Sequence, residues 1–297
     1  MAWSKWQRRS KDIAMAVLKQ VPFEGPLSKR LAQARPQGVS LFWLGQAGFI
    51  IDVKGRRIVV DPYLSDSLAF KYRDSSHSHA RMACAPVTVE ELGPVDLVLC
   101  THHHTDHMDG ETLQRLAMRL PHLKFVVPAA SGPLALQRLG VAADRLIEVD
   151  AGESMHLPAF RLQVMRAAHE SVEQDEQGRH RFLGYGLDFG TLRIFHSGDT
   201  IPFEGQDDEI MAFAPDLALL PVNGRSEALK SAGFAGNLTL AEATSLCKRC
   251  GIAVMIAHHY GMFAFNTIEP EVIDDAAQTS GALVRAREGI EFRLDAA

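Results

Sequence analysis

Residues 101–107 read Thr-His-His-His-Thr-Asp-His and hold four of the 13 histidines in the 297-residue chain. They directly follow an apolar run that is typical of a buried strand, and an expected helix begins shortly after them. In an extended backbone alternate side chains share one face, so His102, His104 and Asp106 are expected to point the same way, with His107 joining as the chain turns. Imidazoles and carboxylates bind divalent metals, and the segment therefore indicates a metal site.

Histidines and aspartates also stand at the ends of other expected strands. His169 and Asp199 follow two of them, and His258 and His259 end a third. Sites in open α/β sheets form beyond the carboxyl ends of strands, so these side chains are expected to meet the histidine-rich segment. A surface tag would stand alone, and this gathering favours a shared metal site. His103, on the opposite face of its segment, is interpreted as a supporting or structural residue.

Strands and helices alternate along most of the chain, and sheets with helices outside them are therefore expected. Strands are predicted at residues 39–44, 48–53, 56–64, 95–100, 124–128, 145–150, 160–167, 183–190, 191–197, 216–222, 252–259, 281–287 and 290–294. Helices are predicted at residues 111–121, 133–140, 204–214, 239–251 and 269–280.

The charge balance and the length of the apolar runs argue against a nucleic-acid partner and against a membrane span. The chain carries 31 basic and 36 acidic residues, which gives a formal net charge of −5. Binding of nucleic acid requires a basic face that this balance does not indicate, so no nucleic-acid partner is expected. No apolar run approaches the roughly 20 residues that cross a bilayer, so no membrane span is expected. A homo-oligomer is left open.

The chain is interpreted as a helical leader at residues 1–38 that packs on one α/β domain at residues 39–297. An Arg-Arg pair near the start is similar to a twin-arginine signal, but Asp12 and Lys19 interrupt the apolar stretch that follows it. An amphipathic leader helix and a cytoplasmic location are therefore favoured. The polar stretch at residues 66–86 lacks a clear period and is predicted to be a long functional loop.

Cys247 and Cys250 form a C-x-x-C pair late in a predicted helix. A redox pair usually opens a helix, where the helix dipole lowers the thiol pKa, and no second pair completes a zinc site. The two cysteines are therefore interpreted as incidental residues of the helix.

The order H-x-H-x-D-H, then His, Gly-Asp and a final His, resembles the metallo-β-lactamase superfamily, and the similarity spans residues 39–273. The resemblance implies an α/β fold, a four-layer αββα sandwich, and a metal-dependent hydrolase. The phrases "WLGQAGFIID", "VVDPYLS", "FHSGDT" and "AHHYGMFAFN" are similar to the subgroup around L-ascorbate-6-phosphate lactonase.

This resemblance also implies roles for individual residues. One metal is expected on His102, His104 and His169, and a second on Asp106, His107 and His259, with Asp199 bridging the two. His259 is preferred to His258 because the ligand of the subgroup directly precedes the position of Tyr260. Asp61 matches an aspartate that orients a ligand imidazole from outside, although a turn aspartate before proline is the alternative.

Two divalent ions, zinc or manganese with iron as an option, are the expected cofactors. Such a pair lowers the pKa of a shared water, and the resulting hydroxide would attack a small ester, such as the lactone of L-ascorbate 6-phosphate or of a related sugar phosphate. Asp106 is the candidate proton shuttle. His196 is expected either to donate a proton to the substrate or to pack within its strand.

The substrate is expected to be a small anionic molecule, which requires cationic or amide donors. Arg225, Asn266 and Arg81 are the candidate substrate-binding residues, with Lys71 and Arg73 in the same polar loop as Arg81. A solvated surface charge or a turn residue is the alternative for each.

Three other functions remain open from the sequence. A metal-dependent phosphodiesterase would use the same ligands. Diiron oxidoreductases share the expected fold, but their pattern has a glutamate where this chain has His104. A non-catalytic metal-binding protein is the third, although the complete ligand set favours an enzyme.

Overall fold

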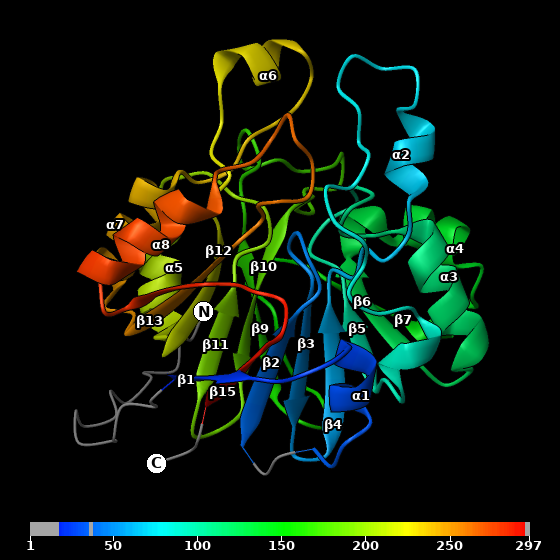
Figure 1. The fold of residues 1–297 in the computed structure, drawn as a ribbon. Coiled ribbons are helices and arrows are strands. Elements are labelled where there is room, and N and C mark those ends of the chain that lie inside the picture. The colour runs from blue at the N-terminus through cyan, green and yellow to red at the C-terminus, as the bar shows by residue number, and fades with distance from the viewer. Residues whose placement is uncertain (1–17, 36–37, 295–297) are drawn as a thin grey trace.

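The computed structural model of the protein describes residues 18–35 and 38–294. Two β-sheets face each other and helices cover both outer faces, so the chain forms four layers (Figure 1). The predicted αββα sandwich is confirmed. None of the helices in the described ranges is long and apolar enough to span a bilayer.

The first sheet has eight strands, and its second half is parallel from β4 onward. Its order is β1 (Leu18–Pro22), β15 (Ile290–Leu294), β2 (Val39–Trp43), β3 (Phe49–Val53), β4 (Arg56–Val60), β5 (Leu97–Leu99), β6 (Lys124–Pro128) and β7 (Leu146–Val149).

The second sheet has seven strands and is parallel from β11 to β14. Its order is β14 (Leu283–Arg285), β13 (Val254–His258), β12 (Leu217–Pro221), β11 (Arg193–His196), β10 (Leu183–Asp188), β9 (Arg161–Arg166) and β8 (Ser154–His156). The predicted strands are therefore present, and β1 and β8 are additional ones.

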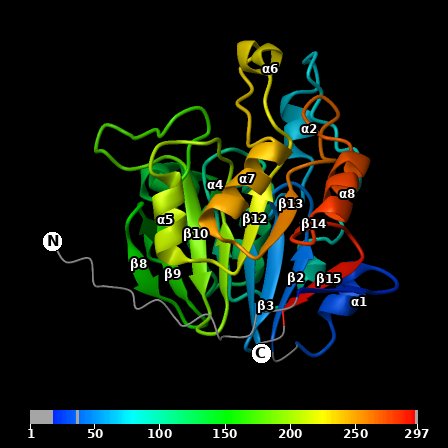
Figure 2. The ribbon, with the colours of Figure 1, turned by 90° about the vertical axis from the view of Figure 1, so that its left-hand side faces the viewer.

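Helices pack on the outside of each sheet, as Figure 2 shows for the second one. The first sheet carries α3 (Gly110–Arg119) and α4 (Gly132–Leu139), and the second carries α5 (Gln206–Phe213), α7 (Leu240–Cys250) and α8 (Pro270–Thr279). The short helices are α1 (Leu27–Leu31), α2 (Ser67–Lys71), α6 (Glu227–Ser231) and the 3₁₀ turns Glu90–Leu92, Ala129–Ser131 and Ala143–Arg145.

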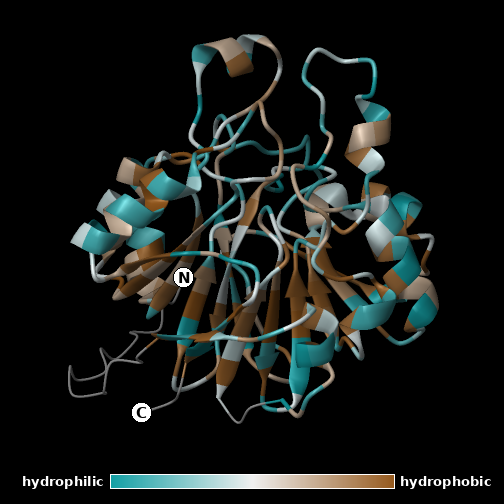
Figure 3. Cartoon of the chain, in the orientation of Figure 1, coloured by the Kyte–Doolittle hydropathy of each residue, from teal (hydrophilic) through white to brown (hydrophobic). Residues whose placement is uncertain are grey.

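The pleat of β2 explains how one strand serves two cores. Leu41 and Trp43 pack between the two sheets, whereas Phe42 and Leu44 pack against the side that carries α3 and α4. Successive side chains of a strand point to opposite faces, so a strand buried on both sides must be apolar throughout. Figure 3 shows this as brown, hydrophobic strands between polar outer helix faces.

The leader differs from its prediction where the structure describes it. Residues 1–17, which hold most of the expected amphipathic helix, lie outside the described ranges. Residues 18–22 form the edge strand β1, which pairs antiparallel with β15 near the other end of the chain. The helical prediction is therefore wrong for this strand, because pairing with a distant segment overrides a local helical pattern.

The strand directions bring the predicted site residues to one edge. Asp61 directly follows β4, and the histidine-rich segment follows its parallel neighbour β5. In the second sheet β11 and β13 run parallel through β12, and β9 runs the same way because it is antiparallel to β10, which is antiparallel to β11. Asp199, His259 and His169 follow these three strands.

The buried Arg57 side chain holds several segments under the first sheet. Its guanidinium donates to both carboxylate oxygens of Asp52 at 2.8 and 2.7 Å, and to the carbonyls of Leu92 and Leu31. The side chains of both charged partners are almost fully buried. Removal of one partner leaves a buried charge without compensation.

We expect Arg57→Ala to lower the free energy of unfolding by about 3–5 kcal/mol, as is typical for a broken buried pair. The control is Arg56→Ala, whose ion pair with Asp96 is 53% exposed on the arginine side and is expected to contribute less than about 1 kcal/mol. Urea unfolding of both variants measures the difference. Equal losses would contradict this role for Arg57.

Candidate metal centre

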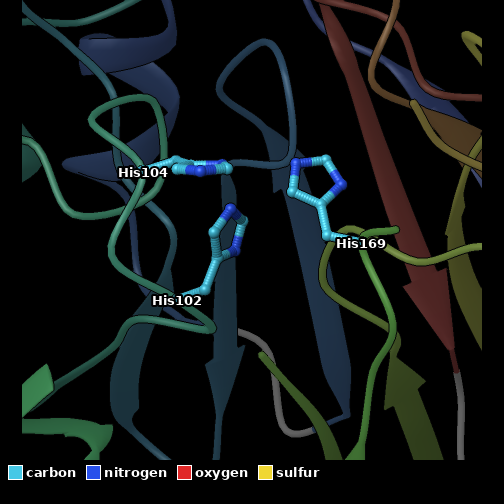
Figure 4. Close-up of side chains that lie close together, drawn as sticks. All are labelled: His102, His104 and His169. Carbon is cyan, nitrogen blue, oxygen red and sulfur yellow. The ribbon is translucent and has the colours of Figure 1, made fainter. Parts of the chain in front are cut away.

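Three imidazoles form the first group of candidate metal ligands. One donor atom each of His102, His104 and His169 lies within 4.8 Å of the other two. The ring centroids are 4.7 Å apart for His102 and His104, and 4.9 Å apart for His104 and His169. Figure 4 shows the three rings around a common space, two from the segment after β5 and one from the segment after β9.

A second group lies directly beside the first. Donor atoms of Asp106, His107 and His259 also lie within 4.8 Å of one another. Asp199 stands between the groups, because its carboxylate oxygens lie 3.3 Å from His107 Nε2, 3.1 Å from His259 Nε2 and 3.8 Å from His169 Nε2. The structure thus brings together all seven residues that the sequence predicted as ligands, in the predicted groups of three with Asp199 between them.

The histidine-rich segment reaches this arrangement through turns rather than through an extended backbone. The backbone N–H groups of His107 and Met108 both donate to the carbonyl of His104, at 3.1 and 2.8 Å. The prediction that alternate residues share a face of a strand was therefore wrong in its geometry. The turn instead wraps the side chains of His102, His104, Asp106 and His107 around one point.

Asp61 orients His107 from behind. Its Oδ2 lies 2.7 Å from His107 Nδ1, and its carboxylate also accepts from the backbone N–H and the hydroxyl of Thr101 at 2.7 and 2.6 Å. Because Nδ1 is thereby occupied, His107 Nε2 faces the cluster, which is how carboxylates orient metal-binding imidazoles. The supporting position predicted for Asp61 is the one that the structure gives it.

Backbone strain marks the same place. Asp61, Gln46 and His259 have φ angles of 44°, 50° and 62°, in the left-handed region that residues other than glycine rarely adopt. Gln46 Nε2 donates to Asp106 at 2.8 Å, and the Gln46 carbonyl accepts from the backbone N–H of His259 at 2.9 Å. Strain of this kind concentrates at functional sites, where the surrounding contacts hold it in place.

The buried donor set itself fits divalent metal ions. His102 Nε2, His107 Nε2, Asp199 Oδ1 and His259 Nε2 are buried and have no hydrogen-bond partner among the residues that the structure describes. Buried polar atoms are normally satisfied, so a group of them that face one another points to an occupant. Nitrogen and oxygen donors in sets of three match the protein ligands of catalytic zinc and related ions.

The pKa shifts describe the charges within the cluster. Burial lowers the pKa of His102 well below its usual range and that of His104 to about 3, so both imidazoles are neutral and able to coordinate. Burial alone would raise the pKa of Asp199, but the neighbouring His107 and His259 side chains hold it well below the usual value. Neutral imidazoles beside ionised carboxylates are the forms that bind metal.

The cluster forms the floor of a cavity of about 280 Å³. Two histidines outside the ligand groups take different places around it. His103 lines the cavity beside His104, with ring centroids 4.8 Å apart. His258 is buried and stacks on His196, with centroids 5.2 Å apart, and only its neighbour His259 belongs to a ligand group.

His196 has a structural position rather than a catalytic one. Its Nε2 lies 2.9 Å from the carbonyl of Ala47, and its Nδ1 accepts from the backbone N–H of Gly198 at 3.1 Å. The ring is fully buried and is not among the residues that line the cavity. Because both ring nitrogens are used within the protein, the catalytic role predicted for His196 has no support, and packing within the strand is the better reading.

Two predicted substrate-binding arginines also have other partners. Arg225 donates to both carboxylate oxygens of Glu242 at 2.6 Å, and Arg81 donates to the carbonyls of Tyr63 and Ser65 at 3.0 and 3.4 Å. Neither lines the cavity above the cluster. Both interact with groups that lie far away in the sequence, which no local pattern could reveal. Arg73, the third arginine, pairs with its exposed neighbour Asp74.

Asn266 does line the cavity, as predicted, and belongs to a chain of three amides. Asn237 Nδ2 donates to Asn223 Oδ1 at 3.1 Å, and Asn223 Nδ2 donates to Asn266 Oδ1 at 3.0 Å. Asn237 also lines the cavity, and its buried Oδ1 has no partner within residues 18–35 and 38–294. Asn237 and Asn223 were not predicted from the sequence; each stands beside a glycine in two segments that pair with each other only in the fold.

The two cysteines of α7 are free thiols of low reactivity. Burial raises the pKa of Cys247 to about 12 and that of Cys250 to about 11. Thiols with a raised pKa are poor nucleophiles and poor redox centres. Their incidental role in α7 agrees with the prediction.

We expect Asp61→Asn to weaken metal binding at the centre by about 10–100-fold, the usual effect of removing the group that orients a ligand imidazole. The amide keeps the size of the side chain but loses the charge that faces His107 Nδ1. Titration with zinc in competition with a chromophoric chelator measures the affinity. Asp74→Asn, whose side chain is 92% exposed, is the matched control; an Asp61 variant as tight as this control would contradict the role.

The layered fold and the histidine–aspartate cluster at one sheet edge together define a chain of the metallo-β-lactamase type. A family model described as Beta-lactamase superfamily domain matches residues 56–260. The chain therefore belongs to this superfamily.

Individual relatives agree with this membership. A metal-dependent hydrolase of Hyperthermus butylicus is 28% identical over 261 residues, which cover 86% of this chain and 92% of the relative. N-acyl-phosphatidylethanolamine-hydrolyzing phospholipase D 1 of Caenorhabditis elegans is 24% identical over 246 residues, covering 78% of this chain and 66% of the relative. The crystal structure of an isothiocyanate hydrolase from Delia radicum gut bacteria has a TM-score of 0.71 at 17% identity, with 87% of this chain and 100% of that chain covered, which supports the fold.

Proposed function

We propose that the protein is a metal-dependent hydrolase that cleaves small carboxylic esters, with lactones as the first class to test. The observation that carries this proposal is the group of buried, unpartnered nitrogen and oxygen donors on the floor of an accessible cavity. A cluster that only stabilised the fold would have no need of a cavity above it. The curated relative named a metal-dependent hydrolase supports the same class of activity.

The ligand groups would hold two divalent ions, one on His102, His104 and His169 and the other on Asp106, His107 and His259, with Asp199 shared between them. When bound, such ions supply a hydroxide nucleophile near neutral pH and a Lewis acid for the oxygen on which charge develops. No serine or cysteine nucleophile is needed for this chemistry.

The chain's own residues would orient the reacting groups. Gln46 fixes the carboxylate of Asp106 through a 2.8 Å hydrogen bond, so that one oxygen has a defined direction at the edge of the cavity. This arrangement keeps Asp106 as the candidate for moving a proton to the leaving group, although coordination to a metal lowers the basicity of a carboxylate.

The chain of three amides offers a polar contact for the substrate. Asn237 and Asn266 stand at its two ends and both line the cavity, while Asn223 links them. Each link uses one donor and one acceptor. The chain therefore leaves Asn237 Oδ1 as the acceptor at one end and Asn266 Nδ2 as the donor at the other. The donor at the Asn266 end would hold an oxygen of the ester over the cluster, and the acceptor at the Asn237 end would accept from a hydroxyl group of the substrate.

We expect Asn237→Ala to reduce kcat/KM for ester hydrolysis about 10-fold, the order of magnitude of one lost hydrogen bond. Metal content should stay unchanged, because Asn237 belongs to no ligand group. Parallel measurement of kinetics and of zinc content separates the two effects. Loss of metal with loss of activity would instead make Asn237 a structural support of the centre.

The phosphate of the predicted sugar-phosphate lactone has less support than its ester. Arg81 and Arg225 face other partners, and Lys71 is the candidate cation that does line the cavity. The proposal therefore rests on the ester and includes L-ascorbate 6-phosphate lactone only as one compound of the panel.

A phosphodiester is the second candidate substrate, because one relative is a phospholipase D that hydrolyses N-acyl-phosphatidylethanolamine. The same ligand groups suit attack on phosphorus. Hydrolysis of bis-p-nitrophenyl phosphate, compared with simple lactones by the zinc-loaded or manganese-loaded protein, separates the two. Faster cleavage of the phosphodiester would replace the ester proposal.

The two other classes of function predict different results with the metal-loaded protein. A diiron oxidoreductase would consume oxygen or another oxidant with iron bound, and a non-catalytic metal-binding protein would turn over neither substrate. His104 occupies the position at which the oxidoreductase pattern has glutamate, and it lies within the first ligand group. We therefore expect redox-silent behaviour with zinc or manganese bound.

A further inference from the structure

Three segments that lie far apart in the sequence meet above the metal centre. Residues 67–82 include α2, residues 226–237 include α6, and residues 260–267 follow β13. In Figures 1 and 2 the first two protrude beyond the body of the molecule on the same side. All three segments contribute side chains to the cavity whose floor is the ligand cluster.

The contacts between these segments are mainly aromatic. Phe234 lies 4.9 Å from Phe265 and 6.4 Å from Tyr72 between ring centroids, and His79 stacks on Tyr72 at 4.1 Å. His79 also lies 4.9 Å from Phe263. We call these five residues the aromatic wall.

The aromatic wall is only partly hidden from solvent. Phe263 and His79 are buried, whereas Phe234, Phe265 and Tyr72 keep part of their rings exposed. All five line the cavity. Aromatic surface inside a ligand cavity normally binds apolar groups, because its exposure to water is unfavourable until it is covered.

The charged groups near the wall favour an uncharged substrate group at this place. Arg138 lines the cavity but donates to the backbone carbonyls of His103 and Met108. Lys71 is exposed at the rim, with its ammonium 5.0 Å from the ring centroid of Tyr72. The remaining wall presents ring faces and edges, and burial of apolar surface contributes about 25 cal/mol per Å².

We propose that the aromatic wall binds an apolar group of the substrate, so that the protein selects esters that carry a short alkyl or aryl substituent beside the scissile bond. This inference rests on the proposed ester hydrolysis and specifies its substrate class. The cavity of about 280 Å³ is at the low end for ligand sites, which favours a small ester over a long lipid chain.

The test uses two lactones that differ only in one apolar substituent, γ-butyrolactone and γ-octalactone, together with the corresponding lactams, which resist hydrolysis. Calorimetry gives the Kd of each lactam with metal-free and metal-loaded protein, and kinetics gives kcat/KM for each lactone. We expect the butyl group to tighten lactam binding and to raise kcat/KM, each by about tenfold or more.

Phe234→Ala and Phe265→Ala should lower binding and kcat/KM severalfold more for the butyl compounds than for the unsubstituted ones, and so remove most of this gain. The matched control is Phe70→Ala, because Phe70 belongs to α2 but is 70% exposed and does not line the cavity. Phe234→Leu should keep much of the gain, since it keeps apolar surface. The comparison of the two lactams with wild-type protein needs no variant, so a folding defect in a variant does not prevent the test.

Three results would overturn the inference: equal Kd values for the two lactams, equal losses for both compounds in Phe234→Ala, or a tighter Kd for the same ring with a phosphate in place of the butyl group. The second result would mean that the wall only joins the three segments. Failure of the proposed function is a separate outcome, in which neither lactone is hydrolysed while the lactams still report on the wall.

Discussion

His104→Ala is expected to reduce ester hydrolysis by about 1,000-fold or more while the fold is retained. The imidazole belongs to the first ligand group and lies beside the rings of His102 and His169. Loss of a metal contributes several kcal/mol to the barrier, and each 1.36 kcal/mol is a factor of ten in rate. Steady-state kinetics, zinc content and circular dichroism of the purified variant measure the three effects.

The control for this variant is His122→Ala, which removes a histidine from the exposed turn before β6. It should match the wild-type protein in rate and in metal content. Unchanged turnover by His104→Ala would refute the assignment of this residue. Unfolding of the variant would call for His104→Gln, which retains a polar side chain of similar length.

Removal of metal by a chelator is expected to abolish hydrolysis and to lower the melting temperature by about 5–10 °C. The fold brings the donor atoms of the ligand groups within 4.8 Å of one another, so metal is expected to bind the folded chain far more tightly than the unfolded one. Ligand at 100 times its Kd stabilises the folded state by about 2.7 kcal/mol, and 1 kcal/mol shifts the melting temperature by about 2–4 °C in a chain of this size.

Readdition of zinc or manganese should restore both the hydrolytic activity and the melting temperature. Kinetics measures the first and differential scanning calorimetry the second. Magnesium is the matched control, because it prefers oxygen ligands and should restore neither. An equal melting temperature with and without zinc would show that the cluster does not bind the metal.

The sequence predicted the parts of the fold that depend on local pattern. The strands from Val39 to Val60 are apolar runs separated by glycines; all three were predicted, and they pair as the antiparallel meander β2–β3–β4. The helix near Asp109 also begins as predicted, because the Asp109 side chain caps it by accepting from the backbone N–H of Thr112. Local signals of this kind are readable without a structure.

The ligand positions could also be predicted, because side chains at the carboxyl ends of strands that run the same way must meet at one edge. The backbone conformation of the segment that carries four of these ligands could not be predicted. The histidine-rich segment turns where an extended backbone was expected, and hydrogen bonds from the His107 and Met108 N–H groups to the His104 carbonyl close this turn.

The errors concern partners that lie far away in the sequence. Arg225 finds Glu242, and Arg81 finds the carbonyl of Tyr63, so neither is available to a substrate. His196 gives Nε2 to the carbonyl of Ala47, 149 positions away. The side-chain type alone indicates what each group could bind, whereas the fold decides which partner it meets.

The most direct test of the metal centre is anomalous X-ray scattering at the zinc edge from crystals of the zinc-loaded protein. We predict two peaks at bonding distance, about 2.0–2.2 Å, from the ligand atoms. One should lie among His102, His104 and His169, and the other among the second ligand group, with Asp199 between them. A map with no anomalous peak within this cluster, or with zinc bound only elsewhere on the chain, would contradict the account.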